Sequence, residues 1–122
     1  MHRTIPTVIV AASAALREEL SHKLGLPDFG VVVYKPLSAI LWGEFPRDER
    51  YLFVIEAAET ASLLTAQIAQ LKQQYPISRI VLLGQDWTRA EISTAFKAGA
   101  NAYFRDTTVS AELLEAIKLI TR

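Results

Sequence analysis

Cysteine is absent from the 122 residues, and histidine is nearly so. The first absence excludes disulfide bonds, thiol nucleophiles and thiolate metal sites, and it leaves the redox compartment undetermined. The only histidines, His2 and His22, lie far apart in the sequence, so neither a histidine metal pair nor a catalytic dyad is expected. Glycine occurs five times, never with the spacing of a nucleotide-binding loop. The sequence therefore gives no support to a Rossmann or P-loop enzyme.

Excess charge and long apolar runs are missing as well. Thirteen Lys and Arg residues stand against thirteen Asp and Glu residues, so no bulk charge draws this chain to nucleic acid or to an anionic membrane. No run approaches the roughly 18 apolar residues of a membrane span. The N-terminal apolar stretch "VIVAASAAL" runs into the charged "REEL", unlike a secretory signal. We expect a cytoplasmic, soluble single domain that can bury its own core.

What the sequence does contain is an alternation of strand-length apolar runs with helix-length amphipathic segments. Strands are predicted over residues 5–11, 29–34, 51–55, 78–84 and 101–104. Helices are predicted over residues 14–25, 58–75, 88–99 and 110–120, with a short additional helix opened by Pro36.

Local capping signals support the helix boundaries. Ser13 is a candidate N-cap for the first helix, and Gly25 a candidate stop. Thr88 with Glu91 three residues later has the spacing of a capping box, and Gly99 closes that helix. Leu64, Ile68 and their apolar neighbours follow helical spacing between these two helices.

Five strands that alternate with helices predict a parallel sheet, because parallel strands need crossover connections. The expected fold class is a doubly wound, three-layer α/β/α domain of flavodoxin-like strand order 2-1-3-4-5. Such folds place their sites at the carboxyl ends of the strands beside the switch point. We therefore expect Ala11, Ala12 and Ser13 to lie opposite Glu56, with Gly84 completing the rim.

The stretch "YLFVIEAAET" ends a buried apolar strand on Glu56, and three roles are open for this carboxylate. It could be an acid of a working site, a charge left in a site that has lost its chemistry, or a solvated strand end. A solvated Glu56 would suit the N-terminus of the helix that begins nearby, as Glu59 also would. Ser13 is better explained as a helix cap than as a nucleophile.

The segment "SRIVLLGQDWTRAEISTAFKAGANAYFRDTTVSAELLEAIKLI" resembles the second half of a response-regulator receiver (CheY-like) domain of the NarL/LuxR class. "AFKAGANAYF" is its most specific part, and "AALREEL" fits the first helix of the same class. The resemblance spans residues 1–122. It implies a receiver-like domain with a helix-turn-helix output domain following Arg122 in the full-length protein.

The resemblance also implies that the phosphorylation site is degenerate. The family's Mg²⁺-binding acidic pair matches Ala11 and Ala12, which offer no oxygen ligands. The phosphoacceptor aspartate matches Glu56, and the hydroxyl residue after the fourth strand matches Gly84. We accordingly expect no Mg²⁺, no other cofactor and no catalytic residue.

The family's lysine after the fifth strand matches Asp106, with Arg105 one place earlier. Arg105 serves as the site's cation only after a one-residue shift of the alignment, and two carboxylates, Asp106 and Glu56, in one pocket would repel each other. Glu56 could imitate a phosphorylated aspartate, although Gly84 lacks the hydroxyl that would sense the charge.

Two aromatic residues have open roles. Tyr103 matches the family's switch aromatic, and it could equally be a strand residue packed under the last helix. Trp87 could be exposed and anchor a protein contact, or pack against its own helix. By resemblance, Arg89, Lys97 and Glu112 share with them the contact face of receivers.

The sequence thus favours a regulatory module over an enzyme. We expect a non-enzymatic pseudo-receiver of a bacterial two-component transcriptional regulator, acting through a homodimer or through contact with a histidine kinase or another signalling protein. DNA would be reached only through the output domain. Two alternatives stay open: a pocket that binds a small ligand, or phosphorylation in a non-standard way.

Overall fold

The computed structural model describes residues 5–24, 32–41, 45–46, 49–58, 60–84, 86–105 and 111–121. Its strands and helices alternate along the chain. The strands are β1 (Thr7–Val10), β2 (Val32–Tyr34), β3 (Leu52–Glu56), β4 (Arg79–Leu83) and β5 (Ala102–Phe104). The helices are α1 (Ala14–Lys23), α2 (Leu37–Leu41), α3 (Ala61–Gln74), α4 (Arg89–Ala98) and α5 (Ala111–Ile120).

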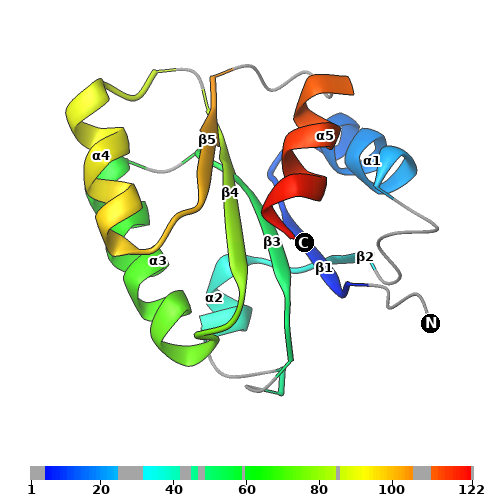
Figure 1. Ribbon diagram of the computed structural model, residues 1–122, viewed down its shortest axis with the longest axis horizontal. Coiled ribbons are helices and arrows are strands. Elements are labelled where there is room, and N and C mark those ends of the chain that lie inside the picture. Colours follow the sequence, from blue (N-terminus) through cyan, green and yellow to red (C-terminus); the bar gives the residue numbers. More distant parts are fainter. Residues whose placement is uncertain are drawn as a thin grey trace.

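All strands of the sheet are parallel, in the order β2-β1-β3-β4-β5. This order confirms the predicted doubly wound, flavodoxin-like fold. Figure 1 shows α1 and α5 on one face of the sheet and α2, α3 and α4 on the other. The three expected layers are therefore present.

Alternation along the central strand supplies both faces of the core. Phe53 and Ile55 of β3 pack with α2 and α3, whereas Leu52 and Val54 pack with α1 and α5. All four side chains are at most 1% exposed. A strand buried on both faces reads as a continuous apolar run, because both sets of alternate side chains meet a helix layer.

Most predicted element boundaries hold to within two or three residues. Ser13 caps α1 by accepting a hydrogen bond from the Leu16 N–H at 3.2 Å, as expected. Thr88 and Glu91 form the predicted capping box, and Gly99 ends α4 with φ 130°, which favours glycine. The predicted stop at Gly25 and start near Ser110 lie outside the described residues.

The strands β1, β4 and β5 are shorter than the apolar runs that predicted them, whereas β3 keeps its predicted length and is shifted by one residue. The predicted start of β2 at residue 29 lies outside the described residues. β1 begins at Thr7 instead of residue 5, and α3 begins at Ala61 instead of residue 58, after Thr60 in the N-cap position. A run of apolar residues marks what is buried, whereas a strand ends where its ladder of backbone hydrogen bonds ends. Among the described helices, none is long and apolar enough to cross a membrane.

Candidate functional site

The carboxylate of Glu56 binds the backbone of the turn that leads into α1. Glu56 is the last residue of β3, and its Oε1 accepts hydrogen bonds from the backbone N–H groups of Ala12 at 2.9 Å and Ser13 at 3.4 Å. These donors belong to the segment between β1 and α1, and β1 is the strand next to β3 in the sheet. The positive dipole end of α1 lies next to this turn and favours an anion there.

This contact corrects one of the three expected roles of Glu56. The side chain is half-buried and bonded to the backbone of a neighbouring segment, so it is not a solvated strand end. Its charge serves the start of α1, whereas the sequence suggested α3, the next helix along the chain. The physical reason is that β1 and β3 are hydrogen-bonded neighbours, with Val10 beside Ile55, so the chain after β1 passes directly over Glu56.

Arg17 is part of the site, and sequence reasoning did not identify it. Its Nη1 donates to the carbonyl oxygens of Ala11 at 2.7 Å and Ala12 at 3.3 Å. The turn between β1 and α1 is thus held from both sides, its amides by Glu56 and its carbonyls by Arg17. The signal available in the sequence was position: Arg17 lies four residues after the cap Ser13, hence on the same helix face.

The resemblance matches the Mg²⁺-binding acidic pair of receiver domains to two alanines. Ala11 and Ala12 lie beside Glu56 as predicted, but their side chains carry no oxygen, and the Ala12 amide is already engaged. The described residues contain no group of three or more Asp, Glu or His side chains placed to hold a metal.

Gly84 makes room for Tyr103. A Cβ built on Gly84 would lie 2.8 Å from the Tyr103 hydroxyl oxygen and 3.0 Å from the Ala57 Cβ. Real Cβ atoms essentially never approach another heavy atom as closely as the first distance. The hydroxyl oxygen is buried, and it finds no hydrogen-bond partner in the described part of the chain. The glycine that removes the expected hydroxyl therefore also permits the inward position of Tyr103.

Tyr103 packs on the α4 side of the sheet, which corrects the expectation of packing under the last helix. It joins the core cluster that contains Ala95 of α4. Its strand neighbours Ala102 and Phe104 join the α5 side. Adjacent strand residues point to opposite faces, so placing Phe104 toward α5 forces Tyr103 toward α4.

Trp87 is buried, which contradicts the prediction that it is an exposed contact residue. It is 7% exposed and lies stacked on Tyr103, with ring centroids 5.5 Å apart and 24° between the ring planes. Stacking on Tyr103 removes the apolar surface of the indole ring from water, and this burial stabilises the inward position of Trp87. Trp87 is therefore a core residue that supports the inward Tyr103.

Arg105 contacts the segment before α4. Its Nη1 donates to the backbone oxygen of Trp87 at 3.4 Å, and the side chain is exposed. No hydrogen bond or ion pair joins it to Glu56 in the described part of the chain, so the hypothesis that Arg105 is the cation beside Glu56 stays a prediction without a contact to support it. Asp106 lies outside the described residues, and its expected repulsion with Glu56 is untested there.

The remaining candidate contact residues are exposed. Arg89 and Lys97 lie on α4, and Glu112 lies on α5. Figure 1 shows these two helices on opposite faces of the sheet, flanking the edge strand β5.

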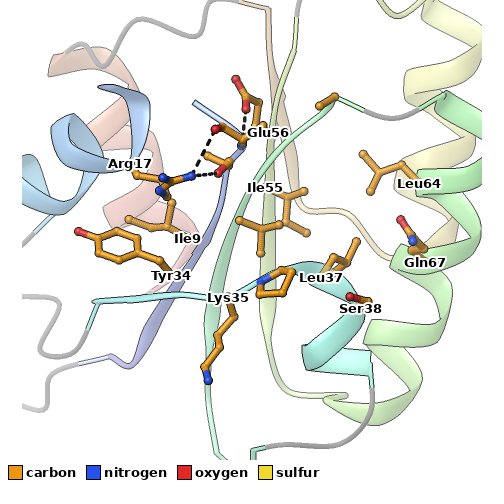
Figure 2. A pocket seen from close by; sticks show the side chains of 15 residues that line it. Ile9, Arg17, Tyr34, Lys35, Leu37, Ser38, Ile55, Glu56, Leu64 and Gln67 are labelled. Atoms are coloured by element: carbon orange, nitrogen blue, oxygen red, sulfur yellow. Dashed lines mark hydrogen bonds between the residues drawn. The ribbon is translucent and has the colours of Figure 1, made fainter. Parts of the chain in front are cut away.

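A cavity of about 700 Å³ opens beside Glu56 (Figure 2). It is lined by residues that follow β1 and β2 and by side chains of α1, α2, β3 and α3. In Figure 2, Arg17 and Tyr34 lie at one end and Leu64 and Gln67 at the other, with Ile55 between them. The carboxyl ends of three strands thus border one open space.

No protein-family model and no curated protein matches the sequence. Solved structures do match the fold. A response regulator from Thermotoga maritima has a TM-score of 0.78 at 21% identity, covering 96% of this chain and 98% of that chain. A LuxR-family two-component response regulator from Aurantimonas has a TM-score of 0.74 at 19% identity, covering 98% of this chain and 86% of that chain.

A third match is a putative pilus assembly-related protein from Burkholderia pseudomallei. Its TM-score is 0.77 at 18% identity, covering 99% of this chain and 92% of that chain. Identities this low establish similarity of fold alone. From these matches and the strand order, the chain has the fold of two-component receiver domains, the CheY-like variant of the flavodoxin-like architecture.

Proposed function

We propose that this chain is a pseudo-receiver: a regulatory domain of a two-component-type transcriptional regulator that is not phosphorylated by the aspartate and Mg²⁺ mechanism. The observation that carries the proposal is the contact of Glu56 Oε1 with the Ala12 amide at 2.9 Å. The carboxylate at these strand ends is thus already hydrogen-bonded to the backbone of the neighbouring turn.

The electrostatics of phosphoryl transfer support this proposal. The reaction depends on positioned cations that neutralise charge developing on the phosphoryl group. Ala11 and Ala12 supply no metal ligand, and Arg105 bonds to Trp87 on another segment. Arg17 donates from Nη1 to two carbonyl oxygens of the turn, and the structure describes no hydrogen bond from it to Glu56. Among the described residues, no cation is hydrogen-bonded to Glu56 to neutralise a phosphoryl group there.

A mass measurement tests this proposal directly. The chain is incubated with acetyl phosphate and Mg²⁺ and then weighed intact, beside a receiver domain that keeps the aspartate and the acidic pair. We expect the comparison domain to gain one phosphoryl group and this chain to gain none. A stable gain that disappears in Glu56→Gln would overturn the proposal and support phosphorylation in a non-standard way.

We further propose that the domain signals through protein contacts made by α4, β5 and α5, as a homodimer or with a kinase-like partner in the cytoplasm. Arg89, Lys97 and Glu112 are exposed there and of mixed sign, which suits a polar rim. Arg89→Glu should raise the dimer dissociation constant in sedimentation equilibrium, whereas Glu18→Arg on α1 should leave it unchanged. Equal effects of the two variants would remove this face from the proposal.

The inward Tyr103 suggests that the contact face has one fixed conformation. Trp87 stacks on one side of Tyr103. The Tyr103 hydroxyl oxygen has no described hydrogen-bond partner, and the glycine at position 84 has no hydroxyl group to offer one. Because residue 84 has no hydroxyl group, a phosphate-like charge at Glu56 cannot affect Tyr103 through a hydrogen bond to that residue. We therefore propose that output depends on partner concentration, with DNA bound through a helix-turn-helix domain of the full-length protein. Loss of DNA binding on deleting that domain is the expected result.

A second candidate is a role in pilus assembly. Two of the structures with this fold are putative pilus assembly proteins from Burkholderia species, with TM-scores of 0.77 and 0.73. The two candidates predict different companion domains. Specific DNA binding by the full-length product would support the transcriptional role, whereas its absence together with a piliation defect on gene deletion would support the second.

A further inference from the structure

The cavity beside Glu56 has walls suited to a small organic molecule. Its volume of about 700 Å³ falls within the range of small-molecule sites in proteins. Val10, Leu37, Ile55 and Leu64 give it apolar walls. Val10 and Leu37 are half-buried and offer the accessible apolar surface, whereas Ile55 and Leu64 are at most 1% exposed and lie in the core behind it. An apolar ligand body would meet a wall fixed by the core.

Arg17 places a positive charge at one end of this cavity. In the described part of the chain its guanidinium is bonded only to the neutral carbonyls of Ala11 and Ala12, both through Nη1. A guanidinium carries five N–H donors, and the donors of Nε and Nη2 are not engaged by any described residue. Figure 2 shows the Lys35 side chain directed away from Arg17. Arg17 is thus a fixed cation whose remaining donors suit a carboxylate.

The opposite end of the cavity holds a buried polar group. The Oε1 atom of Gln67, on α3, is buried without a hydrogen-bond partner among the described residues. Buried polar atoms are nearly always bonded, so an exception that lines a cavity is a place where a ligand group can bond. A ligand hydroxyl could donate to Gln67 Oε1.

A phosphate is the less suitable anion. The backbone amides of Ala12 and Ser13, which would bind it at the start of α1, already donate to Glu56. The carboxylate of Glu56 itself would repel a second multiply charged anion. A singly charged carboxylate directed at Arg17 meets less of this repulsion.

From these contacts we infer that the cavity binds a small amphipathic carboxylic acid. Its carboxylate lies on Arg17, its apolar body lies between Leu37 and Ile55, and a polar group at the far end bonds to Gln67. This inference goes beyond the proposed function and does not depend on it, since an acid ligand could bind whether or not Glu56 accepts phosphate.

Matched small molecules test the inference on the unaltered chain. The probes are 4-hydroxyphenylacetate, its amide 4-hydroxyphenylacetamide, and phenylacetate, each titrated to millimolar concentration while amide chemical shifts are recorded by NMR. We expect 4-hydroxyphenylacetate to shift the signals of Ala12, Leu37 and Gln67. The neutral amide should bind at least about tenfold more weakly, because it lacks the charge-assisted contact with Arg17. Phenylacetate should be intermediate.

Two variants and one control complete the test. Ala58→Trp places a large side chain at an exposed position on the cavity rim and should abolish binding without removing a core residue. Arg17→Met should weaken binding about tenfold, whereas Lys23→Met, at an exposed position near the end of α1 that does not line the cavity, should not change it. Shifts that leave the cavity residues unmoved, equal binding of acid and amide, or binding that survives Ala58→Trp would each overturn the inference.

Discussion

The Oε1 atom of Glu56, at the end of β3, accepts a hydrogen bond of 2.9 Å from the backbone N–H of Ala12, 44 residues earlier in the chain. The contact joins the two strands that flank the switch point of the sheet. It turns a charged strand end into a support for the turn that starts α1. Removing the charge or the side chain is therefore expected to affect stability before any signalling output.

Glu56→Gln keeps a carbonyl oxygen but loses the charge. We expect it to lower the free energy of unfolding by about 1 kcal/mol, because hydrogen bonds to charged groups contribute roughly 1.5–3 kcal/mol and neutral ones roughly 0.5–1.5 kcal/mol. Urea denaturation measures the change. Glu115→Gln is the control. Glu115 Oε1 lies 4.0 Å from Lys118 Nζ in an exposed ion pair, which contributes at most about 1 kcal/mol to stability. An equal decrease in the free energy of unfolding in both variants would contradict a stabilising contact between Glu56 and the turn before α1.

Gly84→Ala should disturb the packing of Tyr103. The added methyl group would meet the Tyr103 hydroxyl oxygen at 2.8 Å, so we expect a loss of about 1–3 kcal/mol, as for other overpacked core positions. Tyr103→Phe removes that oxygen, and the double variant Gly84→Ala/Tyr103→Phe should recover part of the loss. Strict additivity of the two changes would contradict a direct clash between them.

Trp87 provides an independent optical signal of the same displacement. In a Trp42→Phe background it is the only tryptophan of the chain. If Gly84→Ala displaces Tyr103, the ring stacked on it becomes exposed and its fluorescence emission shifts to longer wavelength. An unshifted emission in a destabilised Gly84→Ala variant would place the strain on Ala57 instead, whose Cβ lies 3.0 Å from the added group.

Two tyrosines with buried hydroxyl groups, Tyr75 and Tyr103, should respond oppositely to loss of the hydroxyl. The Tyr75 hydroxyl donates to the backbone oxygen of Ile40 at 3.1 Å and accepts from the Phe45 N–H at 3.4 Å, so Tyr75→Phe should cost about 1–2 kcal/mol. Tyr103→Phe removes a buried hydroxyl without a described partner and should be neutral or stabilising by up to about 1 kcal/mol. Thermal and urea unfolding would both report the difference. A large loss in Tyr103→Phe would show that the hydroxyl has a partner.

Stability should rise with pH on the alkaline side through Lys72. Burial, and secondarily the nearby Arg79 guanidinium, lowers the pKa of Lys72 below its ordinary 10.5. Between the lowered pKa and 10.5 the unfolded chain binds more protons than the folded one, so the free energy of unfolding increases with pH there. Below the lowered pKa the unfavourable effect of the buried charge is fully present.

Lys72→Met lacks this increase. The stability of the unaltered chain relative to Lys72→Met should therefore improve as pH rises from neutrality toward 10.5, measured by urea denaturation in matched buffers. Lys72 also donates to the backbone oxygen of Ser78 at 2.5 Å, a contact that the variant loses at every pH. Lys97→Met, on the exposed face of α4, corrects for the loss of one positive charge. A difference that does not vary with pH would contradict the burial effect.

The sequence determined the element order, the parallel sheet, the helix caps at Ser13 and Thr88 and the position of Glu56 at a strand end. These features follow from apolar periodicity and from hydrogen bonds between residues three or four apart, which a linear pattern contains. It also located Ala11, Ala12 and Gly84 at the carboxyl edge of the sheet, because parallel strands bring their ends together.

Only the tertiary structure decided what those residues contact. The Glu56 to Ala12 bond, the Arg17 clamp and the burial of Trp87 on Tyr103 each join segments placed by packing of the sheet. The side on which Tyr103 packs depended on Phe104 meeting α5, and the fit of Tyr103 depended on a missing Cβ at Gly84. Side-chain direction and close approach are set by neighbours distant in sequence, and no local pattern encodes them.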